Sequence, residues 1–336
     1  MKLVFVGDVM LGRLLNEILK RQPPEYPWGD TLPLFEDADL NICNLECVIS
    51  DRGRPWSMTP KIFHFRSDAK NVEVLKAAGI DMVSLANNHA LDYEYEALED
   101  TFGILHDNGI AFAGAGSDLV AASSPYVREA EELRIGFIAF TDNEPDWAAG
   151  PDSPGVFYVP VDLEDERAQV LLDLVAVTSK RVDLLVVSAH WGPNWGYHPP
   201  PEQPAFARAL VDAGAGMVFG HSGHVFRGVE FYKGRPVIYC AGNFIDDYAV
   251  NELERNDESF IFAAEERNGA IERLRLYPTI ISEFQAIRAT GSRQGQIVGK
   301  MSELCGEFGS LARWLPKQET LEIVPGPGEL MHGAGE

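Results

Sequence analysis

The sequence predicts a layered α/β protein with mixed sheets, and two patterns carry this prediction. Short apolar runs alternate with helical patterns over residues 2–113, which is the signature of a layered α/β sheet. Late in the chain, alternating segments at 260–264 and 271–276 flank Asn268-Gly269, a strong hairpin signal. Two antiparallel strands in a chain of mostly strand–helix units indicate a mixed second sheet.

Each expected strand is short, apolar and bounded by turn residues. The first run, 2–6, shows no alternation, which suits a strand buried on both faces, and Gly7-Asp8 ends it. In chain order the expected strands are 2–6, 40–43, 81–86, 111–113, 134–140, 183–188, 216–219, 235–239, 260–264 and 271–276.

Proline and glycine limit the expected helices. The first helical pattern stops at Pro23-Pro24, and three later ones end at Gly79, Gly109 and Gly214. The expected helices are 11–21, 68–78, 93–108, 163–178 and 205–213.

The chain shows no internal repeat and no second segment with a core of its own. Its 336 residues would suit two average domains or one large α/β domain. We expect one main unit over 1–280, followed by a C-terminal extension over 281–336 with one or two helices and a loose Gly/Pro-rich tail.

Composition and charge exclude two classes of partner. Hydrophobic residues make up 46% of the chain and charged residues 24%, as in ordinary globular proteins. The formal net charge of −23 argues against nonspecific binding to nucleic acid or anionic membranes, since both need a basic face. An anionic substrate must therefore meet a local positive patch or a metal.

The sequence also predicts a soluble cytoplasmic protein. No apolar run approaches the roughly 18 residues of a membrane span, and a first strand beginning at residue 3 leaves no room for a signal segment. Cys43, Cys47, Cys240 and Cys305 form no C-x-x-C pair, so we expect free thiols.

Metal-ligand residue types gather where the expected strands end. A single histidine at a strand end is usually structural, but four of the chain's eight histidines stand there, with two carboxylates and an amide. Mixed nitrogen and oxygen donors suit divalent Mn, Fe, Zn or Ni better than Mg or Ca alone, while the amide and the carboxylates leave harder ions open. The candidate residues are Asp8, Glu46, Asn88, His89, His190, His221 and His224.

Six motifs occur in order over residues 1–250. They are Gly7-Asp8-Val9-Met10-Leu11-Gly12-Arg13, Asn44-Leu45-Glu46, Ser84-Leu85-Ala86-Asn87-Asn88-His89-Ala90-Leu91-Asp92, His190-Trp191-Gly192, Gly220-His221-x-x-His224 and Gly242-Asn243-Phe244. Together they resemble the poly-γ-glutamate capsule-synthesis family, usually called CapA. That family is similar to the calcineurin-like metallophosphoesterases.

The resemblance implies a four-layer α/β/β/α sandwich with two mixed sheets, in which residues 1–280 are catalytic and two metal ions lie between the strand ends. Asp8 and His224 would bind one ion, and Glu46 would bridge. The second ion would be completed by Asn88, His190 and His221. His89 would correspond to the catalytic histidine, with Asp92 orienting it.

The chain departs from the phosphoesterase pattern at one metal position. Those enzymes carry a histidine two residues after the first aspartate, where this chain has Met10. A thioether binds hard or borderline divalent ions poorly, so we expect one tightly held ion and one weakly held ion. The last two histidines are also three residues apart rather than the more usual two.

Substrate contacts are expected from arginines and aromatic residues. A guanidinium group matches phosphate or carboxylate, which makes Arg13, Arg66 and Arg227 candidates, and Arg13 is favoured because it follows a ligand motif. Trp191 and Trp195, in a segment rich in Pro and Gly, are expected either to wall a substrate cleft or to anchor a packed loop.

Three functions follow from these features. The first is a metal-dependent hydrolase of a phosphoester or an amide such as a γ-glutamyl linkage, with two divalent ions (Mn, Fe or Zn) and a small-molecule, peptide or poly-γ-glutamate substrate. The second is metal-dependent peptide epimerisation by proton transfer at Cα, as in lasso-peptide epimerases that resemble this family. The third is a non-enzymatic role in capsule biosynthesis.

Overall fold

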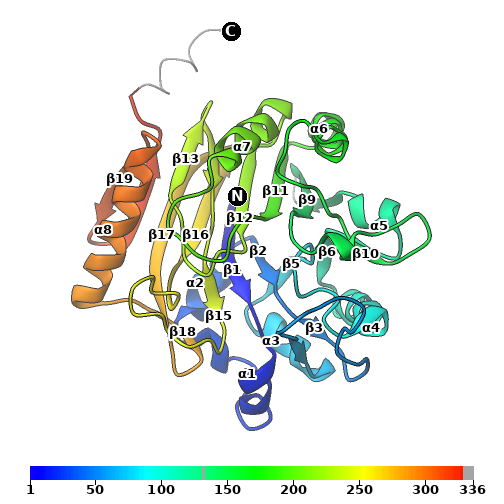
Figure 1. Cartoon of the computed structure of the whole chain (residues 1–336). Helices are drawn as coiled ribbons and strands as arrows, with labels where there is room; N and C mark the ends of the chain where they lie inside the picture. The colour runs from blue at the N-terminus through cyan, green and yellow to red at the C-terminus, as the bar shows by residue number, and fades with distance from the viewer. Residues whose placement is uncertain (131–132, 328–336) are drawn as a thin grey trace.

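Two mixed β-sheets face each other at the centre of the molecule (Figure 1). The computed structural model describes residues 1–130 and 133–327. The larger sheet has the order β19-β20-β17-β16-β1-β2-β5-β6, with β15 beside β1 and β18 beside β17. Its strands are β1 (Lys2–Val9), β2 (Leu40–Leu45), β5 (Ile80–Ser84), β6 (Ala111–Ala113), β15 (Asn243–Ile245), β16 (Glu258–Arg267), β17 (Ala270–Ser282), β18 (Gln285–Arg288), β19 (Leu311–Leu315) and β20 (Thr320–Val324).

The smaller sheet has the order β13-β14-β12-β11-β9-β8. Its strands are β8 (Tyr126–Ala130), β9 (Leu133–Thr141), β11 (Leu184–His190), β12 (Met217–His221), β13 (Val229–Tyr232) and β14 (Arg235–Ile238). Two short pairs lie outside both sheets: β3 (Val48–Ile49) with β4 (Arg66–Ser67), and β7 (Ala115–Gly116) with β10 (Gly155–Val156).

The helices connect successive strands. The α-helices are α1 (Arg13–Ile18), α2 (Leu32–Glu36), α3 (Val72–Ala77), α4 (Glu94–Asp107), α5 (Leu119–Ser123), α6 (Glu166–Thr178), α7 (Glu202–Ala213) and α8 (Gly291–Glu307). The 3₁₀ segments are η1 (Tyr26–Thr31), which is kinked at Gly29, η2 (Ala69–Asn71), η3 (Pro145–Trp147) and η4 (Ser179–Arg181).

Three hydrophobic cores separate the layers and confirm the α/β/β/α sandwich. Between the sheets, alternate residues of β1 meet β9, β11 and β12, and the rings of Phe5 and Phe219 lie 5.1 Å apart. The other face of β1, with Val4 and Val6, packs against α1 to α4. The other face of β11, with Leu185 and Val187, packs against α6 and α7. Strands with both faces covered need the unbroken apolar runs that the sequence shows.

The late hairpin is confirmed, but its place in the fold was predicted wrongly. β16 pairs antiparallel with β17, and Asn268 and Gly269 between them both have positive φ, as a tight two-residue turn requires. However, β16 also pairs antiparallel with β1, so the hairpin belongs to the sheet that holds the first strand. The second sheet forms from the middle of the chain instead. Pairing between β1 and β16 joins residues about 260 apart, which no local pattern reports.

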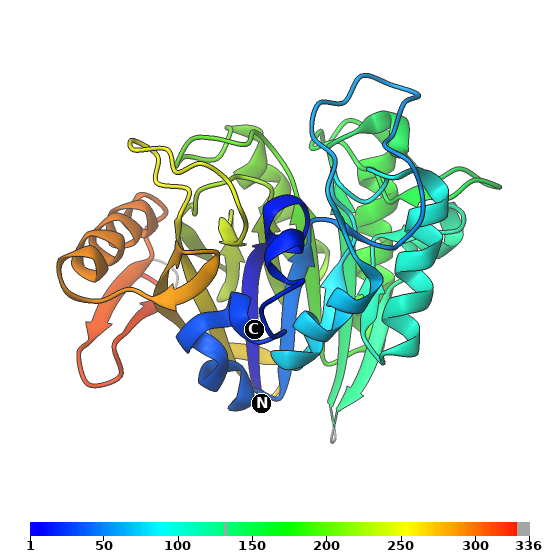
Figure 2. The ribbon, with the colours of Figure 1, turned by 90° about the horizontal axis from the view of Figure 1, so that it is seen from below.

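The C-terminal extension is not only helical. β18, β19 and β20 add to the larger sheet, and α8 packs its buried residues into the core between the sheets. Figure 2 shows α8, in orange, at the outer end of the molecule, far from α4. The division into units at residue 280 stays a prediction, and the end of the expected tail, 328–336, lies outside the described residues.

None of the helices within 1–130 and 133–327 combines the length and hydropathy needed to cross a lipid bilayer. All four cysteines are free and buried, as expected.

Parallel register aligns the ends of the central strands. β11 and β12 run parallel with His190 opposite His221. In the larger sheet, Asp8 of β1 lies opposite Asn44 of β2 on one side and Asn243 of β15 on the other. Polar residues at or next to the last position of four strands, and at the first position of β15, therefore meet at one edge of the sandwich.

Candidate active site

Two histidines from the smaller sheet form one wall of the site. The Nδ1 atoms of His190 and His221 lie 2.9 Å apart. Ser188 Oγ lies 2.7 Å from His221 Nε2, and Asn88 Oδ1 lies 3.0 Å from His190 Nε2, so each ring is oriented by a polar neighbour. Burial lowers the pKa of His221 to about 3 and that of His190 well below its ordinary value. Both rings are therefore neutral and available as nitrogen ligands.

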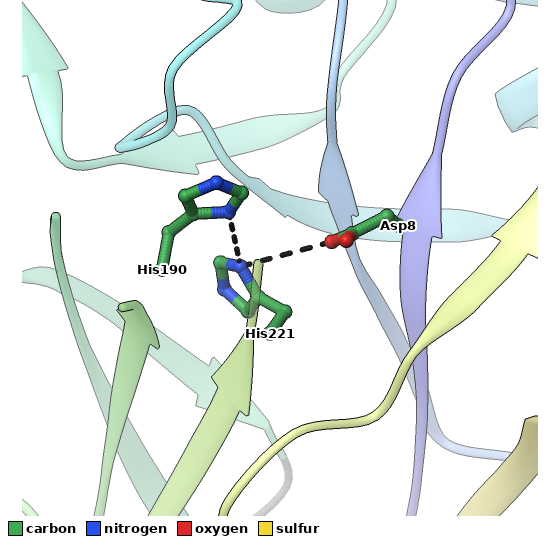
Figure 3. A group of neighbouring side chains, drawn as sticks. All are labelled: Asp8, His190 and His221. Atoms are coloured by element: carbon green, nitrogen blue, oxygen red, sulfur yellow. Dashed lines mark hydrogen bonds and ion pairs between the residues drawn. The ribbon is translucent and has the colours of Figure 1, made fainter. Parts of the chain in front are cut away.

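A carboxylate from the larger sheet faces these rings. Asp8 Oδ1 lies 3.8 Å from His221 Nδ1 and accepts a hydrogen bond of 2.7 Å from Asn44 Nδ2. Figure 3 shows the Asp8 carboxylate pointing at the two imidazoles from the opposite sheet. One ligand atom from each of Asp8, His190 and His221 falls within 4.8 Å of the others, which is the spacing of a metal site.

The carboxylates at this edge are buried without enough partners. Asp8 Oδ2 and Glu46 Oε2 accept no hydrogen bond from the described residues. Burial raises the pKa of Asp8 to about 7 and that of Glu46 well above its ordinary value, and the charge of Asp246 adds to both shifts. Buried, unpaired carboxylates beside neutral imidazoles are costly in the absence of a cation. The donor set therefore fits a divalent metal ion.

The other predicted ligands lie at the same edge. Asn88 lies beside His190, and His224 Nδ1 lies 3.1 Å from Asn243 Oδ1. The structure groups Asp8 with His190 and His221, whereas the resemblance assigned Asp8 and His224 to one ion. How the ligands divide between two ions stays a prediction.

Met10 is buried, and its side chain makes a local hydrogen bond instead of offering a metal ligand. Its sulfur accepts a hydrogen bond of 3.0 Å from the Gly12 amide. The side chain that replaces the usual histidine thus has a local structural partner.

The predicted catalytic pair is formed. His89 Nδ1 lies 2.5 Å from Asp92 Oδ2, which also accepts a hydrogen bond of 2.6 Å from the Phe65 amide. The His89 ring stacks on Phe65 with centroids 3.8 Å apart. Burial lowers the pKa of His89, although the charge of Asp92 acts in the opposite direction. Hydrogen bonding and stacking together hold the ring in one orientation.

A cavity of about 430 Å³ opens over this edge. Arg13 lies on its wall, 3.2 Å from Asp247, with its guanidinium near the rings of Phe63, Phe65 and Tyr248. The cavity is lined by Arg13, Pro60, Lys61, Ile62, Phe63, Phe65, Asn88, His89, Glu144, Asn194, Trp195, His224, Tyr248, Ala249 and Asn256.

Comparison with known proteins places this architecture in a family. Residues 2–248 match the family model described as bacterial capsule synthesis protein PGA_cap. The chain belongs to this family. It is 33% identical to a "probable polyglutamine synthesis accessory protein" of Mycobacterium tuberculosis, over 95% of this chain and 94% of that protein.

Two further family members carry capsule names. The chain is 30% identical to the "PGA biosynthesis protein CapA" of Bacillus subtilis, over 72% of this chain and 62% of that protein. It is 27% identical to the "capsule biosynthesis protein CapA" of Bacillus anthracis, over 96% and 77% of the two chains.

Among solved structures the similarity is weaker. A novel phosphatase from Mycoplasma pneumoniae gives a TM-score of 0.46 at 15% identity, covering 98% of this chain and 96% of that one. A putative 5'-nucleotidase from Staphylococcus aureus gives 0.49 at 14% identity, covering 89% and 57%. At these scores the likeness adds nothing to the fold described from strand order.

Three of the substrate candidates in this PGA_cap chain do not line the cavity. Trp191 is 0% exposed and packs between Phe140 and Phe206, with its indole donating to Tyr239 O. The buried Arg227 donates to the carbonyls of Pro193 and Gly196, which ties down the loop that follows β11.

The third, Arg66, donates to the carbonyls of Arg52 and Gly53 and stacks on Tyr93. All three side chains therefore serve packing and loop structure in the described conformation. Trp195, 41% exposed, does reach the cavity.

Three residues at the site were missed. Lys61 Nζ donates to Asn88 O at 2.7 Å and to Glu144 Oε1 at 3.0 Å, and it lies 3.6 Å from Asp92 Oδ1. It stands in a proline-containing loop where no local signal indicates its role. Asp246 and Tyr248 follow the Gly242-Asn243-Phe244 motif, so a carboxylate just past a ligand-type strand end was the available signal.

Proposed function

We propose that this PGA_cap protein is a metal-dependent hydrolase with two divalent ions, Mn, Fe or Zn, held by Asp8, Glu46, Asn88, His190, His221 and His224. One observation carries the proposal: neutral imidazoles and uncompensated carboxylates from two sheets meet beneath a cavity that is lined by His89, the partner of Asp92. Ions bound there would act as Lewis acids, activating water and polarising the substrate oxygen.

In this proposal His89 moves the proton. The Asp92 carboxylate can only accept, so Nδ1 of His89 carries the hydrogen, and Nε2 is left to exchange a proton with the substrate. His89 lines the cavity, whereas Asp92 is fully buried behind it. Asp92 is therefore a positioning residue, which keeps the imidazole in one tautomer and orientation.

Arg13 and Trp195 would contact the substrate. The Arg13 side chain is 34% exposed and keeps N–H groups beyond its ion pair with Asp247. A guanidinium between aromatic rings suits the phosphate of a phosphoester or the carboxylate of a γ-glutamyl amide. Trp195 supplies an apolar surface on the same cavity.

The test is an activity panel on metal-loaded protein, with generic phosphoesters and γ-glutamyl peptides as substrates. Hydrolysis is expected in the native chain, and His89→Asn should reduce kcat by about 10²-fold or more while keeping the bound metal. His106→Ala, which alters an exposed histidine on α4, is the matched control. Full activity of His89→Asn, or no hydrolysis of either substrate class by metal-loaded protein, would contradict the proposal.

The two ions should differ in affinity because Met10 offers no strong donor. Mild chelation should remove one ion, and if both are needed, activity should fall with it. Calorimetric titration of metal-free protein measures the two affinities. Two equal, tight sites would show that other groups fully replace the missing histidine.

A second candidate is an accessory role in poly-γ-glutamate synthesis without bond cleavage. The names of the relatives from Mycobacterium tuberculosis and the two Bacillus species favour it. Metal-loaded protein that retains poly-γ-glutamate during gel filtration, yet never shortens it, would support this candidate. Chiral analysis of glutamate recovered from the same samples tests epimerisation, which leaves chain length unchanged. A cytoplasmic location stays a prediction.

A further inference from the structure

A carboxylate lies beside the position that Met10 occupies. β15 runs parallel to β1, with Asn243 opposite Asp8 and Ile245 opposite Val9. The Met10 amide donates to Ile245 O at 2.8 Å. Asp246 follows directly after β15, which ends at Ile245. The residue just past the strand beside Met10 therefore carries a carboxylate, whereas Met10 carries only a thioether.

Only one of the two carboxylate oxygens of Asp246 has a hydrogen-bond partner within the described chain. It is 4% exposed, and its Oδ1 accepts a hydrogen bond of 2.9 Å from the Tyr248 amide. Its Oδ2 accepts no hydrogen bond from the described residues. A buried carboxylate oxygen without a partner usually indicates a missing ligand or ion.

Two acidic neighbours of Asp246 form ion pairs. Asp247 pairs with Arg13 and accepts a hydrogen bond from the Leu14 amide, and Asp257 pairs with Arg293. These residues share a small hollow of about 180 Å³ with Asp246. Within residues 1–130 and 133–327, Asp246 forms no ion pair. Of these three acidic residues, Asp246 is therefore the one without an ion pair among the described residues.

Two of the proposed ligands resemble Asp246 in lacking, among the described residues, a hydrogen-bond partner for one buried oxygen. Asp8 and Glu46 each keep one buried oxygen without a partner, and the charge of Asp246 acts on both. Without a cation these three buried carboxyl groups resist ionisation, because their charges would repel one another and lose their hydration. Two divalent ions would compensate all three carboxylates.

We propose that Asp246 is a further ligand of the weaker metal position, where its carboxylate supplies the donor that Met10 does not. This rests on the proposed function only through the existence of the metal centre. An oxygen donor in place of an imidazole favours harder ions, so the weaker position should prefer Mn²⁺ to Zn²⁺ more than the tight position does.

The experiment titrates metal-stripped, full-length protein with Mn²⁺, by calorimetry and by electron paramagnetic resonance of the free ion. Asp246→Asn is the key variant, because Asn keeps an Oδ1 to accept from the Tyr248 amide and loses only the charged donor. Asp257→Asn, from the same hollow, removes an equal charge and is the matched control.

The native chain and Asp257→Asn should bind two Mn²⁺ ions. Asp246→Asn should keep the tight ion and bind the second at least about tenfold more weakly. Adding Met10→His to Asp246→Asn should restore the second ion. Native-like binding of both ions by Asp246→Asn would overturn the inference and leave the proposed hydrolase intact. Absence of metal from the native chain would instead remove the metal centre itself.

Asp246→His covers the case in which Asp246→Asn does not fold. This variant keeps a donor and changes its type, so the Zn²⁺ to Mn²⁺ affinity ratio of the weaker position should rise at least about tenfold. An unchanged ratio would overturn the inference.

Discussion

The two sheets contribute to the site in opposite ways. The smaller sheet supplies His190 and His221, neutral rings that are each oriented by a hydrogen-bond partner. The larger sheet supplies Asp8 and Glu46, carboxylates that each keep an oxygen without a partner. The histidine wall is thus fully hydrogen-bonded without metal. The carboxylate wall, which is incomplete, keeps oxygens that no partner in the described part of the chain compensates.

This difference separates two requirements of a metal site. Geometry comes from the wall whose ligands are neutral, because burying an imidazole costs little once it is hydrogen-bonded. In the proposed metal site, affinity for a cation would come from the wall whose charges are uncompensated. Changes on the two walls should therefore have different signatures.

The largest expected effect is on metal retention. His221→Ala removes a ligand from the ordered wall, and we expect at least about 100-fold weaker binding of one ion. Elemental analysis after gel filtration measures the loss, with His106→Ala as the control. Unchanged stoichiometry in His221→Ala would show that the imidazoles are not ligands.

The second effect is on the free energy of unfolding. Removing a carboxylate that belongs to the larger sheet should stabilise the metal-free protein. The pKa of Asp8 in the metal-free fold is about 7, above its ordinary 3.8. Its stabilising contribution is therefore present below about pH 4 and is lost as pH rises through 7. A shift of this size corresponds to at most about 4 kcal/mol, and we expect about half after relaxation of the site.

Asp8→Asn should therefore be about 2 kcal/mol more stable than the native chain at pH 8 in chelator, and should lose this advantage at pH 4. The carboxamide still accepts from Asn44. Urea unfolding at the two pH values provides the comparison. A variant less stable than the native chain at pH 8 would mean that the Asp8 charge is compensated within the fold.

A smaller effect on metal affinity is expected from removing a hydrogen bond that orients His221. Ser188→Ala removes the hydroxyl beside His221 Nε2, and metal affinity should fall about tenfold while both ions still bind. Ser259→Ala is the matched control. Ser259 belongs to β16 of the larger sheet, and its hydroxyl donates to Ala241 O. Equal affinities in the two variants would indicate that His221 is held by packing alone.

The smallest effect is expected from the four cysteines, which are all buried. Burial raises the pKa of Cys47 and Cys305 to about 12 and that of Cys240 to about 11, and it also raises the pKa of Cys43. All four should remain unreactive thiols at pH 8 in the folded chain and react together in denaturant. Thiol titration with an aromatic disulfide reagent tests this. Rapid labelling of the folded protein would show that the thiols become accessible to solvent, contrary to their buried positions.

Residues near strand ends were the best predicted part of the site. Asp8, His190 and His221 directly end apolar runs, and parallel register then brings such ends together. The His89–Asp92 pair was predictable because its members lie only three positions apart in the sequence, within one turn. Trp191, Arg227 and Arg66 follow the same kinds of motif, yet they turn into the protein, because side-chain direction after a strand depends on what packs there.

By itself the sequence determined the layered α/β class, the hairpin at Asn268-Gly269 and the ligand types at the strand ends. These are local properties, set by runs of apolar residues and by the turn residues that stop them. Only the tertiary structure decided that the hairpin joins the first strand, that Lys61 lies near the His89–Asp92 pair, and that β15, the strand before Asp246, pairs with β1. Those contacts join segments far apart in the chain, and they arise from sheet order and packing, which leave no trace in any single segment.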